Sequence, residues 1–172
     1  MTVTDELRKL LTAQLRALTV VARRLTATRR RAARLFPLTA SAVGQLDERT
    51  IESLDAMVKR FEQLQNGLQD QLFRTLALIE GEDLRDRTRR DVAELMERIG
   101  VLASAADWAE LAILRNRLAH AYPTDKRRQA RVLNDTFKAT DLVLAAFERA
   151  TSRARQHALQ RRREEGRSKR PK

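Results

Sequence analysis

Apolar residues recur every three or four positions along most of the chain, which is the spacing of one face of an α-helix. The pattern predicts five helices, over residues 5–35, 48–79, 89–99, 107–121 and from about 125 onward. A stripe this regular is typical of a seam between helices of a bundle. The longest stripe lies in the second helix and comprises Ile51, Leu54, Val58, Phe61, Leu68, Leu72, Leu76 and Ile79.

Capping residues and helix breakers give the expected ends of the shorter helices. Thr88 and Asp91 have the spacing of a capping box for the third helix. The fourth helix is expected to begin near Asp107, with Glu110 three residues on as its capping partner. Pro123 cannot continue a helix comfortably, so the fourth helix should end just before it.

These elements predict an all-α fold, an antiparallel helical bundle of four to five helices with a long N-terminal helix. Residues 1–36 form a basic long helix that packs on the bundle or projects from it, and residues 48–155 form the bundle itself. Residues 156–172 are a basic tail, expected to be frayed or disordered, because they hold too few apolar side chains to offset the entropy of ordering. Helices of more than 30 residues would be about 45–50 Å long, which favours an elongated shape or a dimer.

Composition excludes several kinds of site and compartment. The chain of 172 residues has no cysteine and two histidines, which leaves too few soft ligands for a zinc site. No apolar run approaches the roughly 20 residues of a membrane span, and the N-terminus lacks the core of a secretory signal. We therefore expect a cytoplasmic protein without metal or cofactor.

The net charge of +12 is concentrated at the two ends. Residues 1–36 carry a net charge of +7 and residues 149–172 carry +8, whereas residues 37–148 carry −3. Clustered cations gain affinity for a polyanion such as RNA by releasing condensed counterions. Charge alone supports equally a solvated surface with a basic tail.

The fourth predicted helix combines polar and apolar residues in an unusual way. At about 100° per residue, Arg115 lies in the middle of an apolar stripe, while Asn116 and His120 share a second face. The only tryptophan, Trp108, and the only tyrosine, Tyr122, flank the same helix. Each residue also has an ordinary interpretation: an arginine paired with an acid, a histidine at a helix C-terminus, a tyrosine packed on the core, a surface asparagine.

The local sequence Arg115-Asn-Arg-Leu-Ala-His120-Ala-Tyr122 resembles the signature of the HEPN (higher eukaryotes and prokaryotes nucleotide-binding) superfamily. Its His-x-Tyr extension is similar to the toxin subgroup that pairs with minimal nucleotidyltransferase antitoxins. The resemblance covers residues 48–150, and the basic N-terminal helix departs from it.

The resemblance implies a ribonuclease that works without metal, assembled as a homodimer in which two motif helices face each other across one cleft. Geometry is consistent with a dimer, because Arg115 and His120 lie about 140° apart on one helix and one copy cannot easily present both to a single phosphate. The implied catalytic residues are Arg115, His120 and Asn116. Tyr122 is implied to be a modification site, to which the antitoxin attaches AMP.

Residue chemistry fits this interpretation. His120 can accept the proton of a ribose 2′-hydroxyl near neutral pH, and Arg115 can stabilise charge on the phosphoryl oxygens. Two alternatives stay open. The first is a non-catalytic HEPN module that binds a nucleotide or scaffolds a nucleotidyltransferase. The second is a basic helical nucleic-acid-binding protein, although the terminal segments 1–35 and 149–172 contain no aromatic residue for base stacking.

Overall fold

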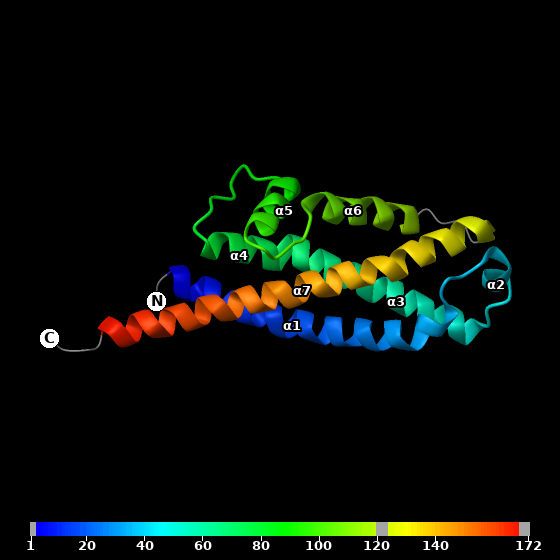
Figure 1. The fold of residues 1–172 in the computed structure, drawn as a ribbon, viewed down its shortest axis with the longest axis horizontal. Coiled ribbons are helices and arrows are strands. Elements are labelled where there is room, and N and C mark those ends of the chain that lie inside the picture. Colours follow the sequence, from blue (N-terminus) through cyan, green and yellow to red (C-terminus); the bar gives the residue numbers. More distant parts are fainter. Residues whose placement is uncertain (1–2, 120–123, 169–172) are drawn as a thin grey trace.

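The computed structural model describes the backbone of residues 3–119 and 124–168, and within these residues the chain is helical without any strand. Figure 1 shows the helices lying side by side in an elongated bundle. In chain order the elements are α1 (Val3–Ala32), η1 (Ala33–Leu35), α2 (Ala40–Gly44), α3 (Glu48–Gly67), η2 (Leu68–Leu72), α4 (Phe73–Ile79), α5 (Arg89–Arg98), α6 (Ala105–Ala119) and α7 (Lys126–Ser168). The predicted all-α class is confirmed.

Successive long elements run in opposite directions (Figure 1). The chain follows α1 to one end of the bundle, returns through α3, η2 and α4, runs forward again in α6, and returns in α7. The short helix α5 packs on α4 and α6, while α2 packs on α7. This arrangement places α6, the helix that carries the motif, between α5 and α7.

The basic N-terminal helix packs on the bundle instead of projecting from it. Leu11, Leu18 and Leu25 of α1 are buried against the rest of the core. At Gly67 of α3, a Cβ atom would stand 2.4 Å from the Cδ2 atom of Leu18. A larger residue at position 67 would therefore require the Leu18 side chain to move.

The second predicted helix contains one feature that its sequence did not predict. The helix runs without a break from Glu48 to Ile79, but residues 68–72 form a turn of π-helix. Leu68 and Leu72 of this turn are fully buried, as the stripe predicted. The prediction was wrong for Ile51, which is 44% exposed.

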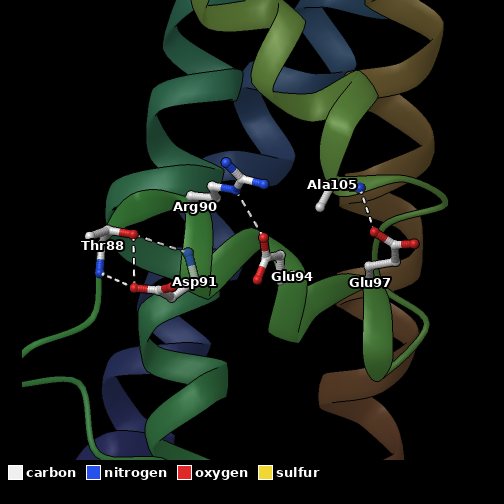
Figure 2. Close-up of polar contacts among 6 residues, drawn as sticks. All are labelled: Thr88, Arg90, Asp91, Glu94, Glu97 and Ala105. Carbon is white, nitrogen blue, oxygen red and sulfur yellow. Dashed lines mark hydrogen bonds and ion pairs between the residues drawn. The ribbon is translucent and has the colours of Figure 1, made fainter.

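Figure 2 shows polar side chains that cap the N-termini of α5 and α6. Thr88 and Asp91 form the predicted capping box: Thr88 Oγ1 accepts from the Asp91 amide at 3.2 Å and the Asp91 carboxylate accepts from the Thr88 amide at 2.7 Å. The prediction for α6 was wrong by two residues. The Ser104 hydroxyl accepts from the Asp107 amide at 3.0 Å, so Asp107 receives the cap instead of supplying it.

A side chain from α5 completes the start of α6. The Glu97 carboxylate accepts a hydrogen bond of 2.7 Å from the Ala105 amide (Figure 2). The first amides of a helix have no partner within it, and a carboxylate there is also favoured by the helix dipole. The start of α6 is therefore fixed by a neighbouring helix as well as by its own cap.

Helix α7 is the longest of the described helices and has an aspartate cap at its start. Asp125 caps its start, with Oδ1 accepting from the Arg128 amide at 2.9 Å. The helix extends to Ser168, well into residues 156–172. A helical backbone does not test whether these residues fray, so that expectation stays a prediction.

Candidate functional site

Helix α6 is anchored to the core through Trp108. This side chain is 2% exposed, and its ring centroid lies 5.1 Å from that of Phe73. Its indole Nε1–H donates to the side-chain oxygen of Gln69, which belongs to the π turn. Leu111 and Leu114, on the following turns of the same face, are buried as well. The buried hydrogen bond fixes the rotation of α6 about its axis, and with it the direction of every motif side chain.

Arg115 is half-buried, as its position within the apolar stripe predicted. Its Nη1 atom donates a hydrogen bond of 2.6 Å to the side-chain oxygen of Asn66 on α3. Within the described residues, no carboxylate forms an ion pair with this guanidinium. A neutral amide positions the arginine without cancelling its charge, so the guanidinium keeps its capacity to bind an anion.

Asn116 lies on a different side of α6 and is exposed. Ile113, three residues earlier, shares this side and is 44% exposed. Ala109 and Ala112 are exposed there as well, so this side presents small and apolar residues to its surroundings. The structure therefore separates Arg115 from Asn116, as the angular spacing predicted.

Two motif residues cannot be placed in this arrangement. His120 and Tyr122 lie outside the described residues, which resume at Thr124 after the end of α6 at Ala119. Of the three proposed catalytic residues, the structure thus describes Arg115 and Asn116. The distance between Arg115 and His120 stays a matter of prediction.

The hollow near the end of α6 does not suit a phosphate. A cavity of about 490 Å³ includes Leu118 of α6 in its lining, together with apolar residues of α2, α3 and α7. Its polar lining includes the carboxylates of Asp55 and Glu62 beside the ammonium group of Lys126. Two carboxylates and one ammonium group in the lining make this cavity unfavourable for an anion.

The second histidine of the chain has a separate set of partners. His157 Nε2 lies 2.8 Å from Glu80 Oε1, and Arg153 Nε lies 2.7 Å from the same oxygen. The hydrogen bond from Arg153 is the main cause that holds the pKa of Glu80 below its ordinary value; His157 acts in the same direction, and burial opposes it. Glu80 in turn raises the pKa of Arg153. This cluster joins the end of α4 to α7.

The partner of Arg115 was the residue that sequence reasoning missed. Asn66 is 49 positions away in the chain and belongs to a helix whose apolar stripe drew all the attention. A signal was present, because Gln65, Asn66 and Gln69 interrupt that stripe with amide side chains. Amides within a helical seam are typical of buried hydrogen bonds to a neighbouring helix.

Three further findings concern metal sites, membrane spans and similarity to known proteins. In the described part of the chain, no group of three or more His, Asp or Glu side chains is arranged to hold a metal ion. None of the helices described has a stretch long and apolar enough to cross a bilayer. Comparison with protein-family models, with curated proteins and with solved structures gave no match for this chain.

Proposed function

We propose that the chain is a metal-independent ribonuclease of the HEPN type that acts as a homodimer and serves as the toxin of a toxin-antitoxin pair. The supporting observation is the state of Arg115: a half-buried guanidinium, held by the neutral amide of Asn66, five residues before His120. An arginine that served only the fold would be expected to face a carboxylate, because burying an uncompensated cation costs several kcal/mol. A phosphodiester supplies that negative charge when RNA binds.

The proposed reaction is an intramolecular transesterification. The imidazole of His120 removes the proton of a ribose 2′-hydroxyl, and the 2′-oxygen attacks the adjacent phosphorus. The bond from phosphorus to the 5′-oxygen breaks, and this oxygen takes a proton from the second imidazole of the dimer. The products are a 2′,3′-cyclic phosphate and a free 5′-hydroxyl. Arg115 stabilises the charge that develops on the phosphoryl oxygens through its planar donors, and Asn116 orients the imidazole or the phosphate.

The exposed side of α6 supports a dimer. Ala109 and Ala112 allow a second helix to approach closely, and Ile113 offers an apolar side chain that a partner would cover. A twofold interface is self-complementary, because the same surface of both copies meets itself. Two α6 helices opposed in this way would bring two copies of Asn116 to one interface, with Arg115 on the neighbouring side of each helix.

Cleavage and its products test the proposed reaction. Purified chain is incubated with total RNA in the presence of EDTA, and the ends of the fragments are identified. We expect fragments with a 2′,3′-cyclic phosphate and a 5′-hydroxyl, and their loss in His120→Ala, which also controls for contaminating nuclease. No cleavage of any RNA by the wild type, or equal cleavage by His120→Ala, contradicts the proposal; a stable dimer without cleavage would favour the non-catalytic module.

The dimer is tested by placing a charge on the exposed side of α6. In Ile113→Lys, a buried ammonium group would oppose association, so we expect a monomer by analytical ultracentrifugation and a parallel loss of cleavage. Ile51→Lys is the matched control, because Ile51 is also 44% exposed but lies on α3. A wild-type chain that is monomeric while it cleaves RNA would contradict the shared cleft.

Tyr122 supplies a separate part of the proposal. A nucleotidyltransferase partner would transfer AMP from ATP to the phenolic oxygen, releasing pyrophosphate and the phenolic proton. The added bulk and negative charge, two residues from His120, would oppose binding of a substrate phosphate. Mass spectrometry of the chain co-expressed with its genomic neighbour tests this step. Silenced activity with an unmodified Tyr122 would indicate another mechanism of neutralisation.

A further inference from the structure

The outward side of α1 carries arginines that have no acidic residue near them in the sequence. No acidic residue occurs between Glu6 and Asp47. Arg16, Arg23 and Arg30 recur every seven residues, and all three are exposed. Seven residues are about two helical turns, so these side chains leave the same side of the helix at intervals of about 10.5 Å. The result is a row of guanidinium groups along one edge of the bundle.

A groove lies beside this row, where α1 packs along α7 (Figure 1). Its volume is about 570 Å³, and α1 contributes Arg23, Arg30 and Arg31 to its lining. Helix α7 contributes the apolar side chains of Leu144 and Phe147. The groove therefore combines three cationic groups with an apolar wall.

The arginines of the groove differ from their neighbour Arg29, which serves the fold. The guanidinium of Arg29 pairs with Asp141, donates to Thr140 Oγ1 at 2.7 Å, and lies 4.4 Å from the ring centroid of Phe137. In the part of the chain that the structure describes, the three groove arginines have no hydrogen bond or ion pair. Packing of α1 against α7 does not require their charges.

We propose that this groove binds the backbone of a single-stranded nucleic acid. Guanidinium groups match the geometry of phosphate oxygens, and a polyanion gains affinity by releasing counterions when several cations meet it. Phosphate contacts carry this binding, because Phe147 is only 8% exposed and offers a base little surface. An anionic membrane fits less well, because the apolar face of α1 is already buried in the bundle and its exposed side carries only Leu10 and Val20 as large apolar residues among those described.

The groove lacks the means to read a base sequence. Thr19 and Thr26 donate their hydroxyl protons to carbonyl oxygens within α1, at 2.7 and 2.9 Å, so they have no donor left for a base edge. The remaining polar group from α7 is the carboxylate of Glu148, which repels phosphate. We therefore expect binding that depends on salt and is insensitive to sequence.

This proposal does not rest on the proposed ribonuclease activity, because α1 and α6 lie along opposite edges of the bundle (Figure 1). The probes are strands of about 20 nucleotides that cannot be cleaved through a 2′-hydroxyl, namely 2′-O-methyl RNA and single-stranded DNA. Binding to the full-length chain is measured by fluorescence anisotropy over a range of salt concentrations. We expect both strands to bind, because they share the phosphodiester backbone.

The groove is tested by the triple variant Arg23→Gln, Arg30→Gln, Arg31→Gln. Loss of three phosphate contacts should weaken binding roughly tenfold or more and reduce the slope of log affinity against log salt by about 2. The matched control is Arg85→Gln, Arg87→Gln, Arg90→Gln, which removes the same charge from exposed arginines that already pair with acids. Equal weakening by both triple variants would show that only net charge matters and would overturn the proposal.

Two further measurements do not depend on whether the triple variant folds correctly. Glu148→Gln removes a carboxylate from the groove and leaves the arginines intact, so it should tighten binding of both strands. No change in affinity in Glu148→Gln would contradict the location of the site. Vesicles rich in phosphatidylserine form the third arm, and binding to vesicles without binding to either strand would also overturn the proposal.

Discussion

The two histidines of the chain belong to two regions that use arginine in opposite ways. At the junction of α4 and α7, His157 and Arg153 both meet the carboxylate of Glu80, which neutralises the positive charge of the region. On α6, Arg115 meets only the amide of Asn66 among the described residues, and His120 follows five positions later. In the first region the arginine is paired with a carboxylate of the fold. In the second, the guanidinium has a neutral amide and no carboxylate as its partner among the described residues.

Under the proposed function, this difference separates an arginine that serves stability from one that serves catalysis. A half-buried arginine with a carboxylate partner holds two elements together, as Arg153 does for α4 and α7. A half-buried arginine held by a neutral partner keeps its charge, and the protein bears the unfavourable desolvation until a ligand arrives.

The largest expected effect is on catalysis. Arg115→Ala should slow single-turnover RNA cleavage by about 10²–10³-fold, the usual effect of removing one group that stabilises developing charge. The unfolding free energy should fall by about 1 kcal/mol, because the hydrogen bond to Asn66 is lost while no ion pair within the described residues is broken. Arg117→Ala, an exposed arginine of the same helix, is the control and should retain full activity. Equal losses in both variants would point to overall charge instead of the position of Arg115.

Asn66→Asp converts the α6 region into a copy of the α4–α7 region. The substitution keeps the shape of the side chain and places a carboxylate against Arg115, so the guanidinium is neutralised before RNA binds. We expect cleavage to fall by roughly tenfold or more, whereas Asn66→Ala, which removes one net hydrogen bond of about 1 kcal/mol, should cost less than tenfold. Full activity of Asn66→Asp would contradict the view that the neutral partner matters.

Glu80→Ala tests the other region. Removing the carboxylate leaves Arg153 and His157 half-buried without their partner, so the unfolding free energy should fall by about 1–2 kcal/mol, with cleavage unchanged. Glu94→Ala is the control, because its pairing with Arg90 is exposed on α5 and should contribute at most about 0.5 kcal/mol. Urea unfolding measures both variants.

The smallest effect concerns pH. The pKa of Glu80 is held below its ordinary value of 4.5, mainly by Arg153, so its contribution to stability is fully present above that value. The contribution is lost as the pH falls from 4.5 through the lowered pKa, because the folded state must then take up a proton that the unfolded state already holds. In Glu80→Gln the acid-side decline of the unfolding free energy should therefore be smaller than in the wild type, and an identical decline would show that other groups cause it.

The sequence predicted the features that depend on near neighbours along the chain. The capping box of Thr88 and Asp91 and the half-burial of Arg115 both follow from spacing within one helix. Spacing was also the source of error at α6, because Asp107 matches a capping pattern that Ser104 satisfies first. Leu68 and Leu72 are four residues apart, a spacing that a continuous α-helix also allows, so this spacing did not reveal the π turn.

Contacts between distant segments could not be predicted in the same way. The hydrogen bond from Arg115 to Asn66 depends on how α6 rotates against α3, and the indole bond to Gln69 fixes that rotation. The cluster of Glu80, Arg153 and His157 likewise joins residues more than 70 positions apart. Only the three-dimensional structure reveals that Arg153 is paired with a carboxylate, whereas Arg115 is held by a neutral amide.

The most direct test of this account compares the two histidines in one experiment, with RNA cleavage and urea unfolding measured on His120→Ala and on His157→Ala. His120→Ala should lose about 10²–10⁴-fold in single-turnover cleavage and keep the unfolding free energy of the wild type. His157→Ala should keep full cleavage and lose stability, because Glu80 loses one of its two side-chain hydrogen-bond partners. Full cleavage by His120→Ala, or equal losses of cleavage in both variants, would contradict the assignment of function to α6 and of stability to the α4–α7 junction.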